Sequence, residues 1–100
     1  MKKITFVNKP LKSKKFPKDF TYADLVLICL DNPPAQGIKI SEMAERIAVY
    51  NTFKIAKRAP SIQVTKEEIT TILLLIQDMK WTVIDAELVN FFEYLQSLQN

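Results

Sequence analysis

Glycine occurs only once in this chain of 100 residues, at Gly37, and its scarcity limits the folds open to the chain more than any other feature. Turns between β-strands often need glycine where φ is positive, so a chain with one glycine is a poor candidate for an all-β fold. Hydrophobic residues make up 48% of the chain, which argues against disorder. The composition therefore predicts one mainly helical domain, in which Gly37 holds a backbone conformation that other residues avoid.

The first predicted helix follows a capping signal. Thr21 and Asp24 have the spacing of a capping box, with Asp in place of the usual Glu, and an apolar run follows at Leu25–Leu30. The helix must stop by Asn32, because a proline comes next and disfavours helical geometry in the residue before it. Residues 31–37 (DNPPAQG) are therefore predicted to form a turn.

A second helix is predicted over Glu42–Ala59, with Ser41 as its N-cap and Pro60 beyond its end. One apolar stripe is predicted on it, formed by Met43, Ile47 and Tyr50. The weak helix formers at positions 51 and 52 leave open whether the helix breaks near residues 49–52. This question decides one of the functional hypotheses below.

Two further helices are predicted in the second half of the chain. Residues 65–68 (TKEE) form a capping box of the usual kind, and the helix that follows, over residues 66–80, is apolar around most of its circumference. Such a helix is normally central and buried. After a short link over residues 81–84, Asp85 is predicted to cap the last helix, whose apolar face carries Leu88, Phe91 or Phe92, Leu95 and Leu98.

Two short segments, residues 4–7 and 61–65, have the composition and alternation of β-strands. We expect them to pair. The predicted fold class is thus mainly α, with about four helices around a central apolar helix (66–80) and a minor two-stranded β element.

Charge is concentrated at the N-terminus. Residues 1–20 carry seven lysines and one aspartate, whereas residues 21–100 carry seven basic and ten acidic residues. The chain therefore divides into a basic N-terminal strand and loop (1–20) and a single helical domain (21–100). The basic segment is suited to steering the protein toward an anionic partner, and a solvated arm that aids solubility explains it equally well.

The residues that catalysis commonly needs are scarce. The chain has no histidine, a single cysteine (Cys29) and a single glycine. These counts argue against general acid–base catalysis by histidine, a thiolate zinc site, a Cys–His or Ser–His–Asp arrangement and glycine-rich phosphate loops. Cys29 lies in an apolar run and is expected to be a buried core residue. We expect no enzymatic activity, cofactor, metal or small-molecule substrate.

One functional hypothesis is a helix-turn-helix that binds nucleic acid. Residues 22–30 would be its support helix, 42–48 its second helix, 49–51 its turn and 52–59 its recognition helix. The candidate contacts to an anionic partner are Lys12, Lys14, Lys15, Lys18, Lys54, Lys57 and Arg58. The turn lacks the usual glycine, and a continuous helix over 42–58 would remove the motif.

The leading hypothesis is a non-enzymatic protein-interaction module that docks through a helical face, with self-association as one form of it. The chain has more large apolar side chains than a domain of its size readily buries. Candidate interface residues are Trp81, Phe91, Phe92 and Tyr94. We expect a cytoplasmic protein without a membrane partner, since the apolar run at Ile4–Val7 is too short for a signal peptide and no run reaches the length of a membrane span.

The order of several segments resembles that of small bacteriophage-encoded proteins of unassigned function. These segments are Leu25–Leu30, Asn32-Pro33-Pro34, Gly37, Met43–Ile47, Met79-Lys80-Trp81 and Val83–Phe92. The resemblance covers about residues 22–94. It implies a phage accessory or virion-assembly role in the host cytoplasm, and it transfers no functional residue.

Overall fold

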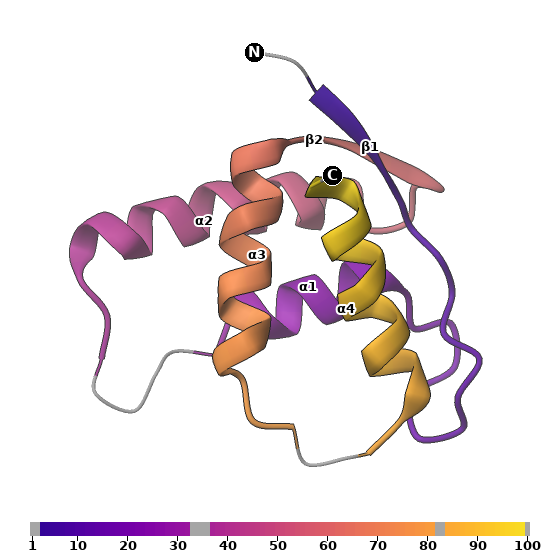
Figure 1. Ribbon diagram of the computed structural model, residues 1–100. Helices are drawn as coiled ribbons and strands as arrows, with labels where there is room; N and C mark the ends of the chain where they lie inside the picture. Colours follow the sequence, from indigo (N-terminus) through magenta and orange to yellow (C-terminus); the bar gives the residue numbers. More distant parts are fainter. Residues whose placement is uncertain (1–2, 33–36, 82–83, 100) are drawn as a thin grey trace.

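The computed structural model describes residues 3–32, 37–81 and 84–99 of the chain. These residues form four helices and a two-stranded antiparallel sheet, which confirms the predicted mainly α fold with a minor β element. The elements in chain order are β1 (Lys3–Val7), α1 (Tyr22–Leu30), α2 (Ile40–Ile55), β2 (Ser61–Thr65), α3 (Lys66–Asp78) and α4 (Ala86–Gln99). Figure 1 shows α3 beside α4, α1 behind them, α2 extending to the left and the sheet at the top.

Two of the predicted connections fall partly outside the described residues. The predicted turn over 31–37 includes residues 33–36, and the predicted link over 81–84 includes residues 82–83. Gly37 itself is described, with φ at +90° and no atom within 4 Å of the place where a Cβ would stand. Its backbone conformation, and not a lack of space, therefore requires glycine at this position, which confirms the prediction.

The sheet pairs β1 with β2, as predicted, in a register that runs from Lys3 opposite Thr65 to Val7 opposite Ser61. Successive side chains of a strand point to opposite sides of the sheet, so alternate residues of both strands face the core. Phe6 and its pairing partner Ile62 both lie in the core. The two strands thus cover one end of the helical core with large apolar side chains.

Helix α1 is the most deeply buried helix, with seven of its nine residues buried. The predicted cap is present: the Asp24 carboxylate accepts hydrogen bonds from the backbone N–H and the hydroxyl of Thr21, at 2.9 and 3.1 Å. Cys29 lies in the core at 2% exposure, as predicted. Helix α1 ends at Leu30, before the proline that was expected to stop it.

Helix α2 is continuous from Ile40 to Ile55, so the break near residues 49–52 that the sequence left open is absent. Val49 and Phe53 are its buried residues, one turn apart, and their burial against the core holds the helix together across the weak helix formers. Asn51 points to solvent, and the Thr52 hydroxyl donates to the carbonyl of Ala48 at 3.2 Å. Tertiary packing overrides the local propensity here.

The predicted ends and apolar stripe of α2 also need correction. Its N-cap is Lys39, and Ser41 lies inside the first turn. Its last residue is Ile55, four residues before the predicted end, and residues 56–60 turn toward β2. Met43 and Ile47 of the predicted stripe are exposed, at 38% and 54%, because only the C-terminal half of α2 rests on the core.

Helices α3 and α4 complete the core. The capping box at Thr65 is present: its N–H donates to Glu68 Oε1 at 2.8 Å, and its hydroxyl accepts from the Glu68 N–H at 3.2 Å. Helix α3 contacts α1, α4 and β2, which places it centrally, although Leu74 on its outer side is 59% exposed. Asp85 caps α4 as predicted, by accepting from the Glu87 N–H at 2.8 Å.

The basic segment is integrated into the fold and is not a free arm. Phe6 is part of the core, the Leu11 N–H donates to the carbonyl of Phe20 at 2.8 Å, and the rings of Phe16 and Phe20 stack at 5.8 Å. The Tyr22 N–H also donates to the Lys9 carbonyl at 2.9 Å, which holds the two ends of the loop together. The boundary predicted at residue 20 therefore does not separate two folding units.

Within the described residues, the helices are too short or too polar for any of them to cross a bilayer.

Candidate interaction surfaces

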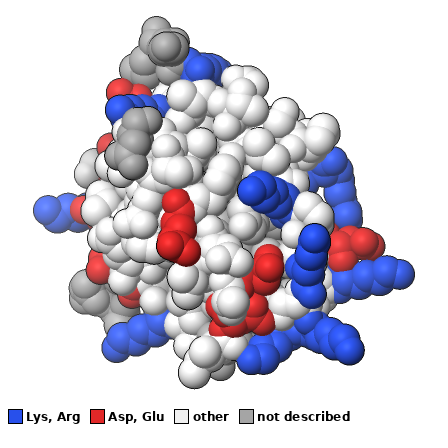
Figure 2. Space-filling model, turned by 45° about the vertical axis from the view of Figure 1, so that its right-hand side comes forward, with Lys and Arg blue, Asp and Glu red and all other residues white. Residues whose placement is uncertain are grey.

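The seven basic residues predicted to meet an anionic partner do not form one uninterrupted surface. On the face seen in Figure 2, basic side chains gather toward the lower right, and acidic side chains lie between them. Lys57 forms an ion pair with Asp24 at 3.4 Å, and Lys15 Nζ donates to the carbonyl of Ile84 at 2.6 Å. Lys54 lies over the ring of Tyr50, with Nζ 5.7 Å from the centroid. The remaining four, which are exposed, are Lys12, Lys14, Lys18 and Arg58.

One shallow depression brings the end of α2 next to the base of the N-terminal loop. Lys57 and Arg58 line it together with Pro10, Asp19 and Asp24. Lys15, in contrast, contacts Ile84, in the segment before α4. Because two of the lining residues are negatively charged, the depression is not a purely basic site for an anion.

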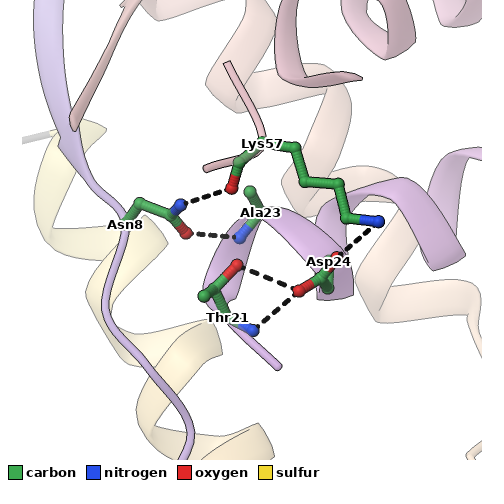
Figure 3. A network of polar contacts seen from close by, with 5 residues as sticks. All are labelled: Asn8, Thr21, Ala23, Asp24 and Lys57. Atoms are coloured by element: carbon green, nitrogen blue, oxygen red, sulfur yellow. Dashed lines mark hydrogen bonds and ion pairs between the residues drawn. The ribbon is translucent and has the colours of Figure 1, made fainter. Parts of the chain in front are cut away.

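Lys57 belongs to a network of polar contacts that joins the N-terminal segment, the start of α1 and the segment after α2 (Figure 3). Asn8 lies at the centre of this network, and the sequence did not predict its role. The Asn8 side-chain amide donates to the carbonyls of Lys57 and Ala59 at 3.0 and 2.9 Å, and its oxygen accepts from the Ala23 N–H at 2.9 Å. The last bond satisfies a first-turn N–H of α1, which has no partner within the helix. The network is structural, and nothing in the sequence around Asn8 marks it as a centre.

The predicted aromatic interface residues fall into two groups. Phe91 is fully buried and its ring packs on Tyr22 at 5.0 Å, so its prediction as an interface residue is wrong. Tyr94 also serves the fold: its hydroxyl accepts from the Val7 N–H at 2.7 Å, and its ring lies 5.7 Å from that of Phe6. Phe91 and Leu95, one turn apart, are the buried residues of α4. Whether Phe91 or Phe92 faces the core depends on how α4 packs against the other helices.

Trp81 and Phe92 lie at the surface, as the interface prediction requires. Both are half-buried and line an apolar groove between α3 and α4 of about 400 Å³. The other lining residues are Ile76, Gln77, Leu88 and Val89. The structure thus brings two of the four predicted interface residues to one surface.

A second apolar surface lies on α2 and was not predicted as such. We define the outer face of α2 as the side of the helix that carries Ile40, Ala44, Ile47, Ala48, Asn51 and Ile55, all of them exposed. At 100° per residue, this face lies nearly opposite Val49 and Phe53, the buried side of the helix. Ile40, Ile47 and Ile55 are 77%, 54% and 87% exposed, and none of the six residues is charged.

The N-terminal half of α2 stands away from the rest of the molecule. Figure 1 shows the left end of the helix apart from the other three, and Arg46 is the only residue between positions 40 and 48 that is not exposed. A groove of about 380 Å³ lies at the base of this half, lined by Leu30, Asp31, Ile38, Met43, Arg46, Ile47 and Tyr50. Ile47 therefore belongs both to the groove and to the outer face.

The ionisable groups with shifted pKa values have structural roles. Burial raises the pKa of the Cys29 thiol to about 12, so the thiolate that nucleophilic or metal chemistry needs does not form near neutral pH. Burial, with smaller effects of Glu87 and Tyr94, raises the pKa of Tyr22. A hydrogen bond from Ser13 lowers the pKa of Asp85, with help from the Glu87 N–H.

No family model, curated protein or solved structure matches this chain. The resemblance to small bacteriophage-encoded proteins therefore stays a prediction.

Proposed function

We propose that this chain is a non-enzymatic protein-interaction module that binds another protein through the outer face of α2. The observation that carries the proposal is the exposure of Ile40, Ile47 and Ile55 on one side of a regular helix, on which none of the six residues is charged. Contiguous exposed apolar surface of this kind commonly marks a contact with another molecule.

The form of the surface also supports the proposal. A helix face presents its side chains in a fixed arrangement, so that little conformational entropy is lost on binding. Amphipathic helices recognise protein partners through residues spaced three and four positions apart, and the outer face has that spacing. Such a module fits the accessory or assembly role that the resemblance to bacteriophage-encoded proteins implies.

Nucleic-acid binding has weaker support. The continuous α2 removes the turn on which the helix-turn-helix hypothesis depends. Of the three basic residues assigned to its recognition helix, Lys57 pairs with Asp24 and Lys54 lies over a tyrosine ring. A module that recognises protein fits these contacts better.

The test uses the tagged chain as bait in an extract of the cells that produce it. Wild type is compared with Ile47→Glu and with Val89→Glu, which places the same charge on an equally exposed apolar position of α4. We expect at least one protein to be retained by wild type and Val89→Glu and lost from Ile47→Glu. If Ile47→Glu retains everything that wild type retains, the outer face is not the binding surface.

A titration of labelled duplex DNA separates the two functions. For a protein-interaction module we expect no fluorescence anisotropy change at near-physiological salt, because four scattered lysines and arginines give only weak, salt-sensitive attraction. Binding that persists at this salt and is lost in a Lys12/Lys14/Lys18/Arg58→Ala variant would overturn the proposal in favour of nucleic-acid recognition.

A further inference from the structure

We draw no further inference here: the strongest candidate, the mainly apolar groove of about 380 Å³ at the base of α2, carries one positive and one negative side chain, Arg46 and Asp31, and nothing in the structure shows what covers it.

Discussion

The two sides of α2 differ in what their apolar residues contact. The inner side, with Val49 and Phe53, is buried against the core, whereas the outer side exposes three isoleucines within the same 16 residues. A fold that needed only the inner side could carry polar residues on the outer one at no cost to stability. The inner side serves folding, and we propose that the outer side serves binding.

The largest expected effect comes from the inner side. Phe53→Ala removes a fully buried ring that packs edge-on against Phe6 at 5.1 Å, and we expect it to lower the free energy of unfolding by about 3–5 kcal/mol. Ile55, two residues along the same helix, is 87% exposed. Ile55→Ala should therefore change the free energy of unfolding by no more than about 0.5 kcal/mol. Chemical denaturation at low protein concentration measures both. Similar losses would remove the distinction between the two sides.

The buried thiol of α1, which packs in the same core, predicts sensitivity to alkaline pH. Because the folded pKa of Cys29, about 12, lies above its ordinary value of 9.0, the thiol's contribution to stability is complete below pH 9 and is lost as pH rises toward 12. By about pH 10.5 the loss should reach about 2 kcal/mol. Cys29→Ala should lose correspondingly less stability between pH 7 and this pH, and equal losses in the two chains would show that the thiol ionises freely in the folded state.

In the network around Asn8, the hydrogen bonds of the Asn8 amide should contribute more to the free energy of unfolding than the ion pair between Lys57 and Asp24 does. Asn8→Ala leaves two carbonyls and the Ala23 N–H without their partner, so we expect a loss of about 1–2 kcal/mol in the free energy of unfolding. Lys57→Ala removes an ion pair whose lysine is 44% exposed and whose aspartate is 10% exposed. Because Asp24 keeps its hydrogen bonds from Thr21, the loss should be about 1 kcal/mol or less. A larger loss for Lys57→Ala would mean that the charge, and not the amide, holds these segments together.

The smallest effect on stability is expected for Ile47→Glu on the outer side. Its side chain is 54% exposed, so the unfolding free energy of the monomer should change by no more than about 0.5 kcal/mol. Thermal unfolding measures this, and the same variant should still lose its protein partner in the extract. A monomer that Ile47→Glu destabilises by several kcal/mol would mean that this residue belongs to the core.

Local signals in the sequence predicted most of the elements. The capping box at Thr65, the cap at Asp85 and the alternation in the two strands each depend on residues a few positions apart, and each is present in the structure. The backbone conformation of Gly37 could be predicted because glycine is the residue type that readily adopts a positive φ. Where a few neighbouring residues decide the geometry, the sequence is sufficient.

What the sequence did not predict depends on how the elements dock. One apolar stripe was predicted on α2, and its members Met43 and Ile47 are exposed, whereas Val49 and Phe53 reach the core. Similarly, either Phe91 or Phe92 could face inward, and docking on Tyr22 selects Phe91. The candidate surface on α2 could have been found from the sequence, because Ile40, Ile47 and Ile55 share one side of a helix with Ala44 and Ala48.

The most direct test of the central claim compares the proteins that wild type, Ile47→Glu and Val89→Glu retain from the cell extract. If the outer face of α2 is the binding surface, a protein retained by wild type and by Val89→Glu should be lost from Ile47→Glu. A protein that Val89→Glu loses and Ile47→Glu retains would contradict the account and move the interaction surface to the groove between α3 and α4, with Trp81 and Phe92.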